Sequence, residues 1–453
     1  MKLFKHQIEG VDFMAGVHGG VLLADEPGLG KTAQVATLIK QQNLLPALVI
    51  CPASVKDNWK REIKMWTGYD AQILSGKSPE GMDQPPPITI INYDILDAWK
   101  MVLAGIRWGC LAIDECHMLA DRASKRTRAT KLISRHALKV IGISGTPVLN
   151  RPADFWPILN IIRPDMFKSF PEYAWAYCDP RKTPWGWEYK GAKNLDRLHQ
   201  TLQTFMIRRK KDVMDLPDKS RVIVPMTVDE PETLQSAEND FIGWLTSNSR
   251  YGNVTSAKKA EAVTKLGVIL RLTSRLKCRS VVRWARQFLA DNPNEKLVLF
   301  AVHRDMIDVL KRRVHPEGVV VIDGSVPTSK RQAIVDSFQN DPKVRLMVAN
   351  VKAAGVGITL TAASTIGVAE LWWTSATMAQ AEDRIHRVTQ DKACTIHYLV
   401  VPGTVEQKIC NAVQTKQQIA DAVIDGHRVT SMPILDLLLS SSKGLMKNVK
   451  KTV

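Results

Sequence analysis

The stretch LLADEPGLGKTAQVA near the N-terminus combines glycine, lysine and threonine at the spacing of a phosphate-binding loop. Gly28 and Gly30 allow backbone N–H groups to converge on phosphate oxygens. Lys31 supplies a point charge for the β- and γ-phosphates, and the Thr32 hydroxyl is a ligand for Mg²⁺. Asp25 stands where the usual loop has its first glycine. The stretch predicts a nucleotide site; the alternative is a glycine turn that is followed by Lys-Thr without binding phosphate.

A pair of acidic residues follows the buried run CLAI, at Asp114 and Glu115. Asp114 is suited to hold Mg²⁺, and Glu115 to orient and deprotonate the attacking water. Strands often end in charged turns, so this pair alone is weak support. Because it lies in the same predicted lobe as Lys31, the two motifs together favour a nucleotide hydrolase.

The sequence QAEDRIHR contains two arginines that are suited to act on the γ-phosphoryl group. Arg384 and Arg387 are spaced one helical turn apart, so we expect both to face one side of a helix. Guanidinium groups can neutralise the charge that develops on a γ-phosphoryl group. Because they lie far along the chain from Lys31, we expect the nucleotide to sit between two lobes and hydrolysis to accompany lobe closure. The alternative is a solvated, charged helix.

The elements that must position these residues are short apolar runs alternating with helical patterns. Up to about residue 150 the predicted strands are GVLLA, ALVICPA, ITIINY, CLAIDE and VIGISG, with helices at Thr32–Gln41 and Asp57–Trp66. From about residue 276 the strands are KLVLFAVH, GVVVID, RLMVAN, TIGVAE and CTIHYLVV, with a helix at Thr328–Asn340. This alternation predicts two parallel α/β lobes whose ligands collect at the carboxyl ends of the strands.

Composition and charge limit the class of protein. A chain of 453 residues has room for two or three domains, and no apolar run approaches the roughly 20 residues of a membrane span. The seven cysteines are scattered, so we expect neither zinc nor disulfides. The formal net charge of +17 favours a polyanionic partner such as nucleic acid, because Lys and Arg release counterions from phosphates. A merely basic soluble protein is the alternative.

Five motifs together carry a resemblance to a known family. ADEPGLGKT, DECH, SGTP, AAGVGITLTAAS and QAEDRIHRVTQ occur in the order found in helicase-like ATPases of superfamily two, and the QAEDR form resembles the SWI/SNF-type branch. YCDPRKTPWGWEYKGAKNLDRL, IRRKKDVMDLPDKSR and AELWW resemble the HARP-type annealing-helicase subfamily. Loops of this superfamily commonly lack the first glycine, so Asp25 is compatible with nucleotide binding.

The resemblance implies an α/β fold of two RecA-like parallel-sheet lobes with a mainly helical insertion between them. The expected domains are a first RecA-like lobe at 1–150, a helical insertion with an aromatic segment at 151–275, a second RecA-like lobe at 276–425, and a C-terminal extension with a basic tail at 426–453. The implied cofactors are ATP and Mg²⁺, and the implied partner is duplex or branched DNA.

The family roles transfer to matching positions. Those expected to bind the nucleotide are Gln7, which matches the glutamine that reads adenine, and Gly28, Gly30, Lys31 and Thr32. Those expected to act in catalysis are Lys31, Glu115, Gln380, Arg384 and Arg387, with Thr32 and Asp114 as metal ligands. Those expected to contact DNA or couple DNA binding to hydrolysis are Ser54, Ser144, Gly145, Thr146, His303, Arg304, Asp323, Gly324, Ser325, Gly355 and Gly357.

The sequence departs from the family pattern at a few positions. Pro27 replaces a common methionine, Ser375 stands where proline is frequent, and Thr389 replaces a glycine, but none of them is a proposed catalytic group. The phosphate-loop region begins almost at once, so we expect no room for the accessory substrate-recognition domains of larger relatives.

The aromatic segment of the insertion has two interpretations. Its members are Trp175, Tyr177, Trp185, Trp187 and Tyr189. The favoured expectation is the core of a small subdomain packed on the first lobe. Because Arg181, Lys182, Lys190 and Lys193 lie among them, the alternative is a surface that grips a DNA fork or exposed bases.

The resulting hypothesis is a DNA-stimulated ATPase that translocates on duplex DNA and remodels or anneals branched DNA or protein–DNA complexes. The alternatives are a strand-separating DNA or RNA helicase and an ATP-gated regulatory DNA clamp. We expect a monomer without membrane attachment, located in the cytoplasm of a bacterial or virus-infected cell, or in the nucleus of a eukaryotic one.

Overall fold

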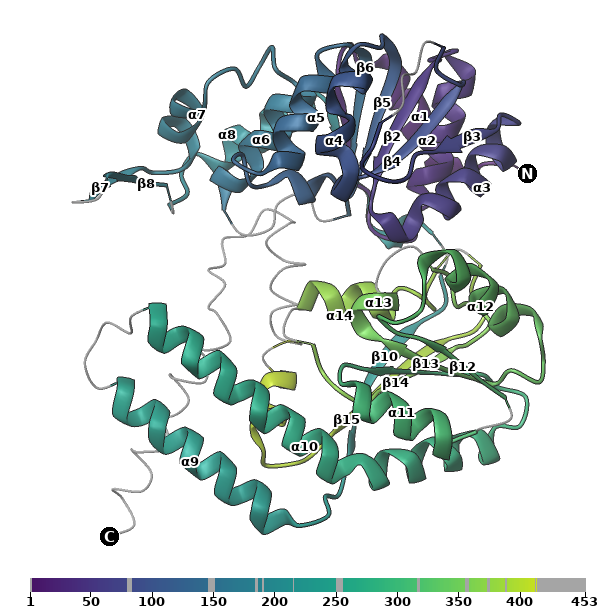
Figure 1. Ribbon diagram of the computed structural model, residues 1–453, viewed down its shortest axis with the longest axis vertical. Helices are drawn as coiled ribbons and strands as arrows, with labels where there is room; N and C mark the ends of the chain where they lie inside the picture. The colour runs from purple at the N-terminus through teal and green to yellow at the C-terminus, as the bar shows by residue number, and fades with distance from the viewer. Residues whose placement is uncertain are drawn as a thin grey trace. The chain divides into compact units, whose positions relative to one another are not determined.

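The computed structural model describes residues 2–79, 84–145, 151–183, 186–189, 191–214, 216–249, 256–315, 318–354, 358–372, 375–387, 389–411 and 413. The chain divides into two compact units, Met1–Asp215 and Leu216–Val453. Each unit is built around its own parallel sheet (Figure 1). No helix in the described part of the chain has the length and hydropathy needed to cross a membrane.

The first unit contains a seven-stranded sheet in the order β3-β4-β2-β5-β6-β1-β9, and all of its pairings are parallel. Its strands are β1 (Val21–Leu23), β2 (Ala47–Cys51), β3 (Ala71–Ile73), β4 (Ile88–Asn92), β5 (Trp108–Asp114), β6 (Ala137–Ile143) and β9 (Met206–Ile207). Its β-branched and leucine-rich central strands are buried along nearly their whole length, as expected for a parallel sheet covered on both faces.

In the first unit, helices that are neighbours in the sequence pack against one another. Contacts join α1 to α2 and α2 to α3, and likewise α4 to α5 and α5 to α6 (Figure 1). The helices are α1 (Lys5–Gly16), α2 (Lys31–Gln41), α3 (Lys56–Thr67), α4 (Tyr93–Ala104), α5 (Lys125–Ser134), α6 (Pro152–Ile162), α7 (Phe170–Tyr177) and α8 (Leu195–Gln203), with short 3₁₀ turns η1 (Ala53–Val55), η2 (Cys116–Leu119) and η3 (Lys211–Val213). A two-stranded antiparallel hairpin, β7 (Arg181–Thr183) and β8 (Gly186–Glu188), follows α7.

The second unit contains a six-stranded parallel sheet in the order β10-β15-β14-β11-β13-β12. Its strands are β10 (Lys219–Pro225), β11 (Leu297–Ala301), β12 (Val319–Ile322), β13 (Leu346–Asn350), β14 (Thr365–Val368) and β15 (Cys394–Val400). Its helices are α9 (Pro231–Ser249), α10 (Ser256–Asp291), α11 (Arg304–Arg313), α12 (Thr328–Asn340), α13 (Val351–Ala354) and α14 (Ser375–Glu382). The central strands β11 and β13 are almost wholly buried in the core.

The two parallel-sheet lobes confirm the expected fold class, and all ten predicted strands are present. The sequence pattern did not predict β3, β9 and β10, nor the hairpin strands β7 and β8. The segment 151–275 does not form a unit of its own, because β9 joins the first sheet whereas β10 joins the second. The exact domain boundaries drawn from the sequence stay a prediction.

Candidate nucleotide site and the residues around it

The phosphate loop joins β1 to α2 and needs its glycines for their backbone conformation. Gly28 and Gly30 have φ angles of 97° and 72°, which side chains strongly disfavour. A Cβ atom at Gly30 would lie 2.2 Å from Nε2 of Gln7. That amide group donates to the carbonyl oxygen of Leu29 at 3.3 Å, so helix α1 is fitted closely onto the loop. Gln7 thus lies beside the loop, and its reading of adenine stays a prediction.

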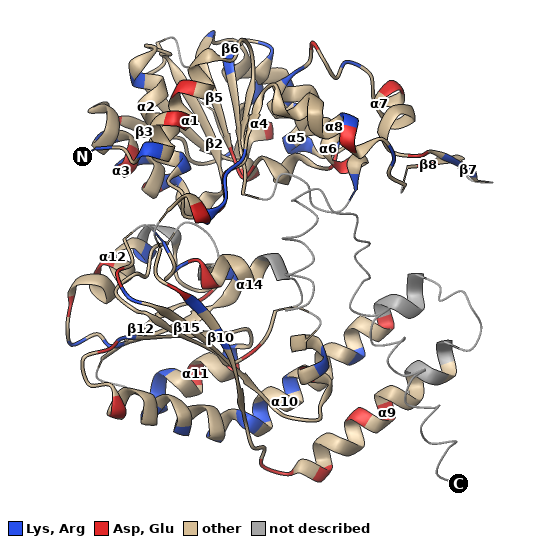
Figure 2. Cartoon of the chain, turned by 180° about the vertical axis from the view of Figure 1, so that it is seen from behind, with Lys and Arg blue, Asp and Glu red and all other residues tan. Residues whose placement is uncertain are grey.

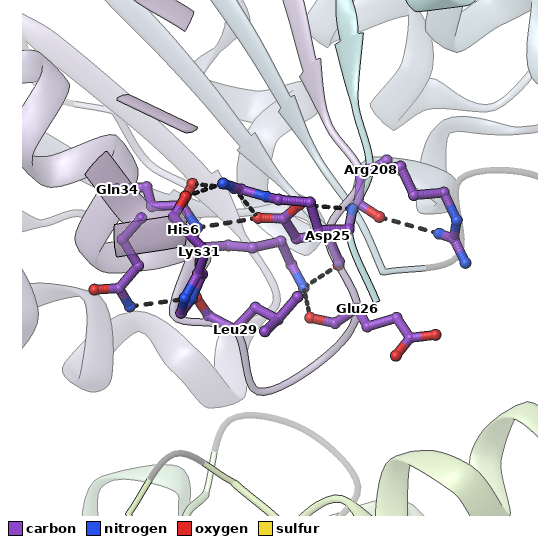
Figure 3. A network of polar contacts seen from close by, with 10 residues as sticks. His6, Asp25, Glu26, Leu29, Lys31, Gln34 and Arg208 are labelled. Carbon is purple, nitrogen blue, oxygen red and sulfur yellow. Dashed lines mark hydrogen bonds and ion pairs between the residues drawn. The ribbon is translucent and has the colours of Figure 1, made fainter. Parts of the chain in front are cut away.

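Lys31 points back into the loop that precedes it. Its ammonium group donates to the carbonyl oxygens of Asp25 at 2.7 Å and Glu26 at 3.1 Å (Figure 3). Thr32 follows it as the second residue of α2. Lys31 and Thr32 are therefore the first two residues of this helix.

Asp25 takes the place of the missing glycine as a fully buried carboxylate that is bonded by Arg209 and by Gln34. Arg209 pairs with it through Nε and Nη2, at 3.0 and 2.5 Å, and also donates its backbone N–H to Oδ1 at 3.0 Å. Gln34 of α2 donates to Oδ2 at 3.1 Å, and Arg209 also bonds the carbonyl oxygen of His6 in α1. The carboxylate thus links α2 and the segment after β9 to the loop, and Arg209 extends the network to α1 (Figure 3).

The segment after β9 makes further contacts with the loop, and we call Arg208–Lys211 the exit segment because it lies just before the end of the first unit. Arg208 donates to the carbonyl oxygens of Ala24 at 3.0 Å and Gly145 at 3.1 Å. The backbone N–H of Lys211 donates to Glu26 Oε2 at 2.9 Å. The sequence did not predict this role, because the basic run IRRKKD was its only signal and indicated no partner for Asp25.

Asp114 ends β5 with its carboxylate held from two sides. Oδ2 accepts the indole N–H of Trp59 at 2.8 Å, and Oδ1 accepts the backbone N–H of Glu115 at 2.9 Å. Burial, followed by the charge of Glu115, raises the pKa of Asp114 to about 6, whereas the charge of Lys31 lowers it. That electrostatic interaction indicates that the predicted acidic pair and the phosphate loop form one site.

Glu115 is linked to the predicted coupling motif through a residue that the sequence analysis did not single out. Its backbone has a φ angle of 49°, a strained conformation outside glycine. Its Oε2 lies 3.2 Å from Nδ1 of His117, and the same nitrogen lies 3.0 Å from Oγ of the buried Ser144. His117 therefore connects the candidate catalytic base to Ser144. Its only sequence signal was its place two residues after Glu115.

The other predicted first-unit residues lie at strand ends of the same sheet. Ser54 lies in η1 directly after β2. Gly145 packs against the loop, because a Cβ atom there would lie 2.8 Å from Cδ of Pro27. Thr146 falls outside the described residues, as do Gly355 and Gly357 of the second unit.

The arginines of the second unit are placed differently from the expectation. Helix α14 ends at Glu382, so Arg384 and Arg387 lie in the turns that follow rather than on one helical face. Arg384 is 5% exposed and donates to the carbonyl oxygens of Gln380 at 2.9 Å and Ile358 at 3.3 Å. Arg387 is half-buried and donates to Oγ1 of Thr359 at 2.9 Å. Gln380 is thus joined to Arg384 through its main chain.

The predicted DNA-contacting residues of the second unit follow β11 and β12. His303 caps α11, and its Nδ1 lies 2.6 Å from Oε1 of Glu370, which follows β14. The hydrogen bond to Glu370 raises the pKa of His303. Asp323 accepts hydrogen bonds from the N–H and hydroxyl of Ser325, which hold the pKa of its carboxyl below the usual value. Arg304 begins α11 and Gly324 lies between Asp323 and Ser325.

The first-unit donor set fits a magnesium-bound nucleoside triphosphate. Two glycines with positive φ free the loop backbone, and Lys31 supplies a cation at the start of α2. The Asp114 carboxylate and Thr32 hydroxyl are hard oxygen ligands of the kind that Mg²⁺ takes. The strained Glu115 lies beside this set as the carboxylate suited to a water molecule.

Fold and site together define a helicase-like ATPase with two parallel-sheet lobes. Comparison with known families agrees: the SNF2-related domain matches residues 6–276, and the helicase conserved C-terminal domain matches residues 280–389. The chain therefore belongs to the SNF2-related family.

Individual relatives show the same likeness. The chain is 32% identical to the SWI/SNF-related matrix-associated actin-dependent regulator of chromatin subfamily A-like protein 1 homolog of Caenorhabditis elegans, covering 100% of this chain and 66% of the relative. It is 30% identical to the DNA annealing helicase and endonuclease ZRANB3 of Bos taurus, covering 94% of this chain and 41% of the relative. The chain thus spans between two fifths and two thirds of the length of these relatives.

Among solved structures, the chain resembles the Sulfolobus solfataricus SWI2/SNF2 ATPase core in complex with dsDNA. The match has 23% identity and a TM-score of 0.45, and it covers 100% of this chain and 97% of the archaeal one.

Proposed function

We propose that this chain is a DNA-stimulated ATPase that translocates on duplex DNA and remodels or anneals branched DNA or protein–DNA complexes. The observation that carries the proposal is the first-unit site, in which the phosphate loop interacts electrostatically with Asp114 and Glu115 is connected to Ser144 through His117. Membership of the SNF2-related family and the name of the annealing-helicase relative support the DNA-directed outcome.

Each residue of the proposed site has its own role in ATP hydrolysis. Lys31 binds the β- and γ-phosphates, while Asp114 and Thr32 would hold Mg²⁺, which would neutralise phosphate charge. Glu115 accepts a proton from the water whose oxygen bonds to the γ-phosphorus as the bond to the β,γ-bridging oxygen breaks. Arg387 is the candidate for stabilising the transferred group, and the buried Arg384 is a positioning residue that holds the loop at Ile358.

The basic charge that DNA binding requires is concentrated in part on one helix. Helix α10 carries nine basic and two acidic residues in its sequence, and the stretches coloured for Lys and Arg are spread along its ribbon in Figure 2. One of the nine, Lys277, is buried and pairs with Glu406. Contacts to phosphates bind any sequence, so we expect binding that weakens with salt and has little sequence preference. Ser54, His303 and Asp323 remain the proposed DNA contacts at the strand ends.

A panel of nucleic acids tests the proposal. ATP hydrolysis is measured with no nucleic acid, single-stranded DNA, duplex DNA, forked DNA and RNA, and triplex-strand displacement then reports duplex translocation. We expect duplex and forked DNA to stimulate turnover most. Efficient unwinding of a tailed duplex without duplex-stimulated hydrolysis would instead identify a strand-separating helicase, and DNA binding without turnover would identify a clamp.

The cellular location follows from the same proposal. The relatives named above are animal proteins, which favours the nucleus over a bacterial or virus-infected cytoplasm. The chain acts as a monomer in this proposal, because both sets of predicted motifs belong to one polypeptide.

A further inference from the structure

The aromatic segment of the first unit separates into a buried half and an exposed half. Tyr173 and Tyr177, one helical turn apart on α7, are 3% and 8% exposed and belong to the first-unit core. Trp175 lies between them in sequence and is 55% exposed, and Trp187 of β8 is 48% exposed. The expectation of a packed core is therefore confirmed for Tyr177 and for the partly buried Tyr189, and wrong for these two tryptophans. Trp185 lies outside the described residues.

The exposed tryptophans contact each other rather than the core. Their ring centroids are 5.2 Å apart with an interplanar angle of 68°. One comes from a helix and the other from the hairpin, so their pairing defines a small surface, which we call the tryptophan pair. A single exposed apolar side chain is ordinary, but two adjoining indole rings form a patch that is suited to a partner.

The base of the hairpin is fixed, although its strands join neither large sheet. Tyr189 packs edge-on against Phe170, with centroids 5.0 Å apart. The backbone N–H of Lys193 donates to the carbonyl oxygen of Tyr177 at 3.0 Å. A Cβ atom at Gly191 would lie 2.7 Å from Cβ of Asp179, so the returning chain lies directly against the start of the hairpin. The hairpin that carries Trp187 is thus anchored at α7, and Figure 1 shows β7 and β8 beside that helix.

The charge around the tryptophan pair indicates the chemistry of its partner. Between Trp175 and Lys193 the sequence holds four basic and two acidic residues. Lys182 and Arg181 are both exposed on β7. Lys182 lies opposite Trp187 in the hairpin register, whereas Arg181 lies opposite Glu188 and its guanidinium group is 3.6 Å from Asp179. Flat aromatic surfaces beside Lys and Arg suit nucleic acid, since bases stack on the rings while the cations contact phosphates. A continuous duplex hides its base faces, whereas a branch point exposes them.

We infer that the tryptophan pair with Lys182 is a binding site for unpaired bases at a DNA branch point. The inference rests on the proposed function for its choice of DNA as the partner. It deepens that function by assigning the preference for branched over continuous DNA to a surface on the first unit, separate from the nucleotide-binding residues.

The test measures DNA affinity without ATP, by fluorescence anisotropy, on two forks that differ only at the junction. One fork carries normal bases there, and the other carries abasic nucleotides with the same phosphates. The wild type should bind the base-bearing fork more tightly. Because stacking contributes about 1–3 kcal/mol per base, Trp175→Ala combined with Trp187→Ala should weaken that binding at least about fivefold and leave the abasic fork almost unchanged.

Matched variants separate stacking from general damage. Trp187→Phe should keep most of the affinity, and Met101→Ala, which removes another exposed apolar side chain of the first unit, should keep all of it. Equal binding of both forks by the wild type, or equal loss on both forks in the double variant, overturns the inference. Because this assay needs no hydrolysis, failure of the proposed ATPase would appear separately, as absence of duplex-stimulated turnover in the wild type.

Discussion

The two units hold their candidate functional residues by different kinds of contact. In the first unit a buried ion pair between Asp25 and Arg209 fixes the phosphate loop across 184 residues of sequence. In the second unit Arg384 and Arg387 donate to acceptors in their own turn, Gln380 and Asp383, and to the loop at 358–359. Breaking a buried ion pair costs several kcal/mol, whereas a typical hydrogen bond contributes about 1 kcal/mol. Substitutions in the first network should therefore threaten the fold, and those in the second mainly the chemistry.

The largest effect is expected for Lys31, because we propose it as the principal cation that binds the phosphates of ATP. Lys31→Ala should abolish measurable ATP hydrolysis while DNA binding survives, because DNA affinity is spread over many basic groups. Steady-state phosphate release and duplex binding measure the two properties. Lys40→Ala, at the exposed end of the same helix, is the control. Retained turnover in Lys31→Ala would remove the loop from the mechanism.

Arg387→Ala should lower kcat by about 10³ or more, as for arginines that stabilise a transferred phosphoryl group, with less effect on ATP affinity. Arg384→Ala should lower kcat to a similar extent, but through displacement of the loop at Ile358. Arg384→Lys should then restore part of the activity, since a lysine can still donate to carbonyl oxygens. Normal hydrolysis by Arg387→Ala with saturating DNA would show that the side chain does not act on the transition state.

Glu115→Gln should slow turnover at least about a hundredfold while ATP still binds, because the amide cannot accept the proton from water. Single-turnover kinetics with bound ATP measure the chemical step directly. The exposed Glu9→Gln is a charge-matched control from the same unit. An unchanged kcat would show that Glu115 is not the base.

Asp25→Asn removes one charge of the buried pair and so tests whether this ion pair stabilises the first unit. The change leaves Arg209 uncompensated, so the free energy of unfolding of the first unit should fall by about 3 kcal/mol. The control is Asp70→Asn, whose exposed pair with Lys64 should contribute about 1 kcal/mol or less. Denaturant titration measures the free energy of unfolding of each variant. Equal losses of this free energy in the two variants would show that burial does not strengthen the Asp25 pair.

The smallest effect concerns pH and the pair of His303 with Glu370. Glu370 raises the pKa of His303, so this pairing stabilises the fold fully below about pH 6.5 and the contribution disappears as pH rises through the folded-state pKa. Glu370→Gln should therefore lower the thermal midpoint more at pH 6 than at pH 8.5, by the equivalent of about 1 kcal/mol. A pH-independent difference would show that Glu370 acts through Ser274 and the backbone N–H groups of Val302 and His303 rather than through the imidazole.

The sequence predicted what depends on local pattern and missed what depends on distant contacts. Buried apolar runs identified the central strands, and strand ends located Lys31, Asp114 and Glu115. The strands β3 and β9 have only three and two residues, and β10 is largely exposed, so none gave a strong apolar signal. Local spacing also extended the helix through Arg384, although the chain turns after Glu382 to bring that arginine to Ile358.

The contacts of the exit segment set a condition for building chimeras of this family. A first unit cut after β9 would lose Arg208 and Arg209, and with them the partners of Ala24, Asp25 and Gly145. The same cut would graft those two arginines onto a foreign first unit that need not have a matching carboxylate. Because Lys211 also bonds Glu26, the crossover that preserves the nucleotide loop lies after Lys211 rather than at the end of the last strand. The segment that can be exchanged as a whole therefore extends past the last strand of the first-unit sheet and ends at Lys211.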